Sequence, residues 1–183
     1  MYKLCKTEQS AQRQHDLENG LLEAMLTKNY EDISISDLCD HLQIPRKSFY
    51  RYFSSKDGAF HALLDHTLQE CSSATPATND SLQYFEQYFF FWLSKKKLLD
   101  ALERSGLSGK LVERTINGAL QDRDFTSHLV RRFPDMNRHH AALFLISGLM
   151  ALMIQWHHSG CKESPYDMAL TVSQLLTDPF FSR

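Results

Sequence analysis

Apolar residues recur at helical spacing near the start of the chain. Between residues 17 and 26 they fall three or four positions apart with polar residues between them, which predicts a helix with one apolar face. These apolar positions are Leu17, Leu21, Leu22, Met25 and Leu26. Tyr30 and Ile33 follow in a short connection and offer further apolar contacts.

Two short helices joined by a tight turn are predicted next. Ser34 and Asp37 form a capping box, in which the serine hydroxyl accepts a hydrogen bond from the backbone N–H of the aspartate. The first helix ends at a turn through Gln43 and Ile44. Pro45 stands in the first turn of the second helix, where a missing N–H costs little.

The second of these helices, over residues 45–52, separates apolar from basic side chains. Phe49 and Phe53 are one helical turn apart and are expected to point inward. The side chains left for the outer face are Arg46, Lys47, Tyr50 and Arg51. Two short helices with this division indicate a helix-turn-helix, whose second helix enters the major groove of DNA.

The rest of the chain also predicts helices and no strand. Helices are expected over residues 56–68, 82–93, 95–104, 108–121, 125–133, 137–158 and 165–177. The polar stretch from Cys71 to Asn79 contains a proline and no large aliphatic residue, so it is the expected domain boundary. The expected fold is all-α, with a three-helix DNA-binding head over residues 1–54, a connecting helix over 55–70, and a helical bundle for effector binding and dimerisation over 71–183.

The composition fits a soluble helical protein. Hydrophobic residues make up 43% of the chain, and 20 basic against 22 acidic side chains give a net charge of −2. The four cysteines are scattered and no signal peptide is recognisable, so we expect reduced thiols in a cytoplasmic protein. The longest apolar run, residues 141–156, falls short of the roughly 18 to 20 apolar residues that span a membrane. We interpret it as a buried helix.

Local charge, unlike net charge, indicates a nucleic-acid partner. Between Gln43 and Lys56 there are four basic residues and no acidic one. DNA phosphates attract such a patch, and the hydroxyls of Ser48, Tyr50 and Tyr52 can donate to phosphate oxygens. The alternative is a solvated helix face that happens to be basic.

Residues 34–57 resemble the DNA-binding segment of the TetR/AcrR, or tetracycline-repressor-like, regulators. The resemblance covers about residues 8–68, and residues 49–56, Phe-Tyr-Arg-Tyr-Phe-Ser-Ser-Lys, are similar to that family's Leu-Tyr-x-His-Phe-x-x-Lys. It implies that Arg46 and Lys47 face base edges. Arg51, which the helical spacing leaves on the outer face, is expected to contact DNA as well. The residues implied to hold phosphates are Ser34, Ser48, Tyr50, Tyr52 and Lys56.

The sequence departs from the family pattern at several positions. Gln43 and Lys47 stand where glycine is common, Pro45 where a capping serine or threonine is common, and Tyr52 where histidine is usual. The proline removes a side-chain cap from the recognition helix. Lys47 adds a long cation, so the operator preference of relatives cannot be copied.

Residues 137–158 are apolar on two faces, and both must be covered. One cover is the chain's own core, and the other is expected to be the same helix of a second subunit, together with the last helix. The expected interface residues are Leu145, Leu149, Leu152, Trp156, Val172 and Leu176. The resemblance implies the same four-helix arrangement, while the alternative is the central helix of a large monomeric core.

The aromatic run from Tyr84 to Trp92 has two interpretations. It can simply fill the core, or it can line a pocket for a small-molecule effector of the kind that relatives sense between such helices. In the second interpretation, Tyr88, Trp92 and Phe144 contact the effector.

Metal, cofactor and enzyme chemistry are not expected. His157 and Cys161 are four residues apart, but Gly160 is expected to end the helix between them. The sequence contains no phosphate-binding loop, no GxSxG or HExxH motif and no dinucleotide glycine fingerprint.

The expected function is that of a repressor that binds a palindromic operator as a homodimer and responds to a small-molecule effector. Two alternatives stay open. The first is an activator of the same fold. The second is a helical adaptor or small-molecule carrier that has lost DNA binding.

Overall fold

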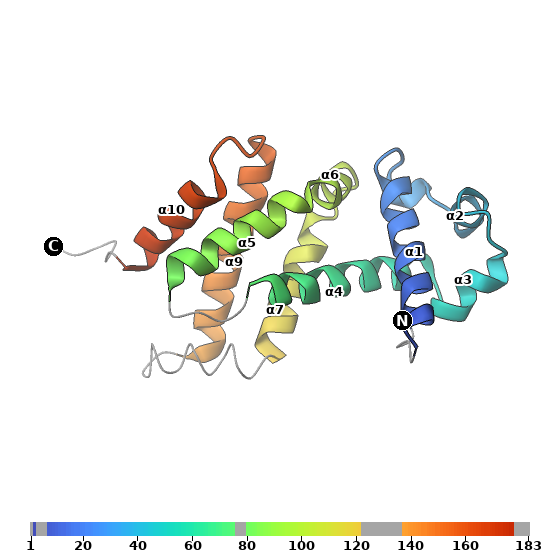
Figure 1. Cartoon of the computed structure of the whole chain (residues 1–183), viewed down its shortest axis with the longest axis horizontal. Coiled ribbons are helices and arrows are strands. Elements are labelled where there is room, and N and C mark those ends of the chain that lie inside the picture. Colours follow the sequence, from blue (N-terminus) through green and yellow to red (C-terminus); the bar gives the residue numbers. More distant parts are fainter. Residues whose placement is uncertain (1, 3–6, 76–79, 122–136, 178–183) are drawn as a thin grey trace. The chain divides into compact units, whose positions relative to one another are not determined.

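Figure 1 shows the computed structural model of the chain, which describes residues 2, 7–75, 80–121 and 137–177. Within these residues the chain is helical apart from turns and one isolated β-bridge between Tyr2 and Phe53. The all-α fold is therefore confirmed. The helix expected over residues 125–133 lies outside the described residues.

The chain divides into two compact units. The first comprises residues 1–69 and 97–107, and the second comprises residues 70–96 and 108–183. The inclusion of residues 97–107 in the first unit was not expected from the sequence, which offers a boundary only near residues 71–79. Their contact with the head includes a hydrogen bond from the backbone N–H of Tyr30 to the Ser105 hydroxyl, 3.1 Å long.

The first unit is built from short and long helices around one core. Its elements are α1 (Glu8–Met25), the 3₁₀ turn η1 (Tyr30–Asp32), α2 (Ile35–His41), α3 (Arg46–Tyr52), most of α4 (Lys56–Ala74) and most of α6 (Lys96–Arg104). α1 begins well before its apolar stripe because Thr7 and Ser10 form a capping box. The buried side chains of this core are Leu17, Leu21, Met25, Ile33, Leu38, Phe49, Phe53, Phe60 and Leu64.

α1 and α2 approach each other closely at Gly20. A Cβ atom on this glycine would lie 2.7 Å from both methyl carbons of Leu42. Such a distance is well inside van der Waals contact, so the absence of a side chain at position 20 lets Leu42 pack against α1.

The second unit contains α5 (Ser81–Ser94), α7 (Ser108–Gln121), α9 (Arg138–His158) and α10 (Pro165–Thr177). α10 packs on α5, and α9 packs on α7. The predicted cap of α10 is confirmed, because the Ser164 hydroxyl accepts from the backbone N–H of Asp167 at 3.2 Å. The buried aromatic side chains of this unit are Tyr88, Phe89, Phe91, Trp92 and Trp156.

α9 is a long and strongly apolar helix. Residues His139–His158 are long and apolar enough to cross a membrane by length and composition, whereas the apolar run predicted from the sequence, residues 141–156, is shorter. Core helices of water-soluble proteins meet the same criteria, and Ile146, Met150 and Met153 are buried here within the protein. The helix is accordingly a core element of the second unit.

Candidate nucleic-acid interface

The turn between α2 and α3 fixes where α3 begins. The capping box predicted for α2 is present, with Ser34 Oγ accepting from Asp37 N–H at 3.0 Å and Ser34 N–H donating to Asp37 Oδ2 at 3.2 Å. At its other end, Ile44 N–H donates to the Cys39 carbonyl at 2.9 Å. Gln43 lies at φ 52° between them, in the left-handed region. This is a Schellman turn with glutamine at the position that glycine usually occupies.

α3 is held by Phe49 on its inner face and by Phe53, the residue that directly follows its last turn. Phe49 is 0% exposed and Phe53 is 1% exposed, and their rings lie 5.4 Å apart. Leu38 and Cys39 of α2 are buried in the same unit. The predicted inward orientation of both phenylalanines is therefore confirmed.

The outer face of α3 carries the cations. Arg46, Lys47 and Arg51 are exposed, and Tyr50 keeps 44% of its surface exposed. Arg46 Nη2 lies 3.5 Å from the Tyr50 hydroxyl, one helical turn away. Pro45 makes no side-chain cap, as its residue type predicts. An exposed face with three positive charges, phenolic and hydroxyl groups and no acid suits the phosphates and base edges of DNA.

Lys56 does not belong to this face, which corrects the expectation that it holds phosphate. Its Nζ donates to the carbonyls of Tyr30 at 2.6 Å, of Ile33 at 2.8 Å and of Glu31 at 3.4 Å. It also lies 4.3 Å above the centre of the Tyr30 ring. Three carbonyls at the end of η1 therefore occupy the three donors of this ammonium group.

Tyr30 completes the same internal cluster, which the sequence did not reveal. Its hydroxyl donates to Asp57 Oδ1 at 2.6 Å. Burial, together with the hydrogen bond to the Asp57 carboxylate, raises the pKa of Tyr30 well above its usual value. The cluster joins η1, which precedes α2, to the start of α4, which follows α3, and so stabilises both ends of the helix-turn-helix.

Three further residues predicted to hold phosphates differ in their surroundings. Tyr52 is buried, with 8% of its surface exposed, so the expectation of an open phosphate contact is not met. Ser48 is half-buried. Ser34 is exposed, and its hydroxyl accepts from Asp37 while keeping its own hydrogen to donate.

The residues predicted to contact an effector do not gather in one place. Tyr88 and Trp92 are packed in the core of the second unit, 6% and 1% exposed, and the Tyr88 hydroxyl donates to Met150 Sδ at 3.3 Å. Phe144 is 79% exposed on α9. The expectation that these three side chains line one pocket is corrected for Phe144, which points away from the core.

The polar atoms around Tyr88 and Trp92 form a second buried cluster. Cys71 lies there, and burial raises the pKa of its thiol to about 12. The pKa of the Tyr88 hydroxyl is likewise raised by burial. Trp92 Nε1 is buried next to the Cys71 thiol and the Tyr88 hydroxyl.

The residues predicted at a subunit interface also separate into two groups. Leu145, Leu149 and Leu152 are half-buried, and Leu176 is 40% exposed. Trp156 is 3% exposed, because it packs edge-on against Phe89 at 5.5 Å and donates its N–H to the Glu163 carbonyl. Val172 is 8% exposed.

Trp156 and Val172 are thus core residues of the second unit, which corrects their assignment to an outer face. The surface that α9 leaves open contains Phe144, Gly148 and Ala151, displaced by one position from the predicted stripe. On α10 the open apolar side chains are Leu170, Leu175 and Leu176.

The end of α9 separates His157 from Cys161, as predicted. α9 ends at His158, and Gly160 follows at φ 86°. Cys161 N–H donates to the Trp156 carbonyl at 2.9 Å, which closes a Schellman turn. The two side chains therefore do not share the face of a continuous helix.

Two family descriptions match this chain. Residues 20–63 match the family described as bacterial regulatory proteins, tetR family. Residues 108–178 match a family described as the C-terminal region of transcriptional regulators. No curated protein sequence matches the chain.

Solved structures of transcriptional regulators share the fold. The fatty acid degradation regulator FadR from Bacillus halodurans has a TM-score of 0.67 at 13% identity, over 98% of this chain and 100% of that one. A transcriptional regulator from Pseudomonas aeruginosa PAO1 has a TM-score of 0.71 at 15% identity, over 93% and 91%. One from Aquifex aeolicus VF5 has a TM-score of 0.63 at 14% identity, over 90% and 97%.

Proposed function

Given that the chain belongs to the TetR family of bacterial transcriptional regulators, we propose that it is a cytoplasmic repressor that binds a palindromic operator as a homodimer and responds to a small-molecule effector. The observation that carries the proposal is the division of α3. Phe49 and Phe53 are buried, while Arg46, Lys47 and Arg51 are exposed. A helix held in this way can lie in the major groove.

Within this interface we assign two kinds of contact. Arg46 and Lys47, at the start of α3, read base edges, because arginine and lysine pair well with the acceptors of guanine. Arg51, Tyr50, Ser48 and Ser34 contact phosphates and set the position of α3 on the duplex.

A homodimer is supported by the open apolar surface of the second unit. Phe144 is 79% exposed and Leu175 is 50% exposed, and large apolar side chains at that exposure are costly in water unless another surface covers them. Gly148 and Ala151, also exposed on α9, would let a second copy of this helix approach closely. Two subunits related by a two-fold axis would read the two halves of a palindrome.

The effector is assigned to the interior of the second unit. Tyr88, Trp92 and Cys71 bring an apolar wall and polar atoms together there, the combination that small-molecule sites use. α4 contains residues of both units, so it offers a continuous element through which effector binding can change operator affinity.

Selection of bound duplexes from a random pool at near-physiological salt tests DNA binding and symmetry together. We expect a palindromic consensus. Arg46→Ala and Lys47→Ala should each weaken binding to that consensus and relax the base preference at one position in each half, by about 1–3 kcal/mol. Lys110→Ala, an exposed lysine of the second unit, is the matched control and should bind normally.

An absence of any enriched sequence, or unchanged affinity in Arg46→Ala and Lys47→Ala, would contradict the proposal. Effector coupling needs a separate measurement. Calorimetric titration of an effector into unbound and operator-bound protein should give two different affinities, since coupling between sites is reciprocal.

A further inference from the structure

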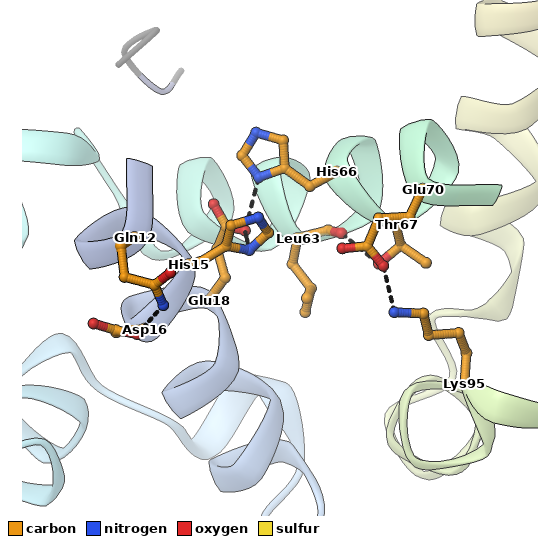
Figure 2. A network of polar contacts seen from close by, with 9 residues as sticks. All are labelled: Gln12, His15, Asp16, Glu18, Leu63, His66, Thr67, Glu70 and Lys95. Atoms are coloured by element: carbon orange, nitrogen blue, oxygen red, sulfur yellow. Dashed lines mark hydrogen bonds and ion pairs between the residues drawn. The ribbon is translucent and has the colours of Figure 1, made fainter. Parts of the chain in front are cut away.

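A compact group of metal-ligand side chains lies in the first unit, apart from the basic face of α3. His15 and Glu18 are three residues apart on α1, and His66 comes from α4. Figure 2 shows the two imidazole rings directed at the carboxylate of Glu18. Spacing along the chain does not bring these residues together, because His66 is 48 positions from Glu18.

Both histidine side chains approach the same carboxylate oxygen, Glu18 Oε2. Glu18 Oε2 lies 2.8 Å from His66 Nδ1 and 3.4 Å from His15 Nδ1. The three potential ligand atoms lie within 4.8 Å of one another, and the two imidazole rings are 5.0 Å apart.

If hydrogen bonds alone held these three side chains together, burying the Glu18 carboxylate would be energetically unfavourable. Glu18 is 0% exposed, and its second carboxylate oxygen, Oε1, is buried with no hydrogen-bond partner among the described residues. A buried carboxylate needs positive charge and full hydrogen bonding to offset desolvation. One protonated imidazole would neutralise Glu18 but would leave Oε1 unsatisfied, and protonating both rings would place two like charges side by side.

A divalent cation would satisfy each of these groups. Its charge would neutralise Glu18, both carboxylate oxygens could coordinate it, and each imidazole would act as a neutral nitrogen ligand. We propose that His15, Glu18 and His66 form a binding site for a divalent transition-metal ion such as Zn²⁺, joining α1 to α4.

The ligand set and its access fit such an ion. Two imidazole nitrogens and one carboxylate suit zinc and its transition-metal neighbours rather than magnesium or calcium, which prefer oxygen ligands. Zinc–ligand bonds of about 2.0–2.1 Å place tetrahedral ligands about 3.3 Å apart. The pair at 3.4 Å therefore needs no change, the pair at 2.8 Å must open slightly, and the two imidazole nitrogens, which lie within 4.8 Å of each other, must move closer together. His15 is 41% exposed and His66 is 26% exposed, which leaves room for entry and for a water ligand.

Titration of the metal-free full-length protein with Zn²⁺ tests the site. We expect one saturable Zn²⁺ equivalent, a rise in melting temperature on binding, and Co²⁺ absorption bands of a low-symmetry nitrogen and oxygen site. Mg²⁺ should give none of these. His15→Ala and His66→Ala should each weaken Zn²⁺ binding by more than about 100-fold, beyond what losing an outer hydrogen-bond partner costs.

The matched control is His41→Ala. His41 lies 3.6 Å from Glu23 in the same unit, and both side chains are exposed, at 57% and 68%. No third ligand accompanies that pair in the part of the chain that the structure describes, so its loss should leave the high-affinity Zn²⁺ equivalent unchanged.

Two outcomes would overturn the proposal: no saturable uptake of Zn²⁺ or Co²⁺ at micromolar concentration by the wild-type protein, or the same uptake by the double variant His15→Ala/His66→Ala. Circular dichroism of each metal-free variant checks the fold. His15 is partly exposed, so His15→Ala gives a folded test even if His66→Ala does not. The measurement is made without DNA and does not depend on the proposed function.

Discussion

Some side chains in the first unit have structural roles that their residue types alone do not predict. Lys56 is the clearest case, because its ammonium group donates to three carbonyls of the η1 segment and lies over the Tyr30 ring. A lysine at the start of a helix next to a basic patch suggests a phosphate ligand, yet here the charge is used inside the protein. The exposed positive charge of this region therefore comes from Arg46, Lys47 and Arg51.

Lys56→Met should destabilise the protein on the order of 2 kcal/mol, because the η1 carbonyls lose a charged donor while the aliphatic stem is kept. Urea denaturation measures this loss. Lys47→Met is the control, since an exposed side chain should change stability by no more than about 0.5 kcal/mol while reducing operator affinity. If Lys56→Met instead had normal stability and weak DNA binding, Lys56 would be assigned as a phosphate contact.

Gln43 is a second residue with a structural role that its type does not predict, because its backbone conformation forms the turn before α3. It has φ 52° in the turn that orients α3, the position that Gly160 occupies at the end of α9. Gln43→Val should cost about 1–2 kcal/mol, because a β-branched side chain strains the left-handed conformation. Gln43→Gly should not destabilise. The midpoints of thermal unfolding should rank glycine at or above glutamine and valine lowest, and equal midpoints for all three would show that the turn relaxes.

At the scale of elements, the predictions that the structure confirms concern partners that lie close in sequence. The capping boxes of α2 and α10 and the inward pair Phe49 and Phe53 are of this kind. Partners distant in sequence were missed. Trp156 is buried because Phe89 of α5 covers it, and a helix that is apolar on two faces does not show which neighbour covers which face.

The assignment of Lys56 failed for the same reason. Its ammonium group is bound by carbonyls more than twenty residues earlier in the chain, and no spacing rule connects those positions. The basic face of α3 could be predicted because its charges and the two buried phenylalanines lie within eight consecutive residues, 46–53. The buried contacts of Lys56 with the η1 carbonyls could not be predicted in this way.

The contact between α1 and α2 gives a prediction at this scale. Gly20→Ala gains helix propensity of up to about 1 kcal/mol but places a Cβ atom 2.7 Å from Leu42. Gly20→Ala should therefore be more favourable in a Leu42→Ala background than in the wild-type background. A double-mutant cycle by chemical denaturation should give a coupling of about 0.5–3 kcal/mol, and strict additivity would mean that Leu42 moves aside freely.

At the scale of the whole molecule, the proposed function gives the two units different roles: the first binds DNA, and the second joins two subunits. The first unit presents three exposed cations on α3, too few for tight binding by one head at physiological salt, since each phosphate contact adds only a modest counterion term. Joining two heads in one assembly makes the second contact intramolecular and raises the effective affinity. The regulatory activity proposed here thus depends on the open apolar surface of the second unit.

Phe144→Glu tests that dependence. Phe144 is 79% exposed, so the substitution should leave the fold of each subunit intact, while in a dimer it would place two carboxylates against an apolar surface. Sedimentation should show dimers for the wild type and monomers for Phe144→Glu, with a matching loss of operator affinity. Phe90 of α5 is 67% exposed, so Phe90→Glu introduces the same charge at a similar exposure on a different helix and should remain dimeric. If Phe144→Glu is dimeric as well, the subunits associate through another surface, and the α9 face has been assigned wrongly.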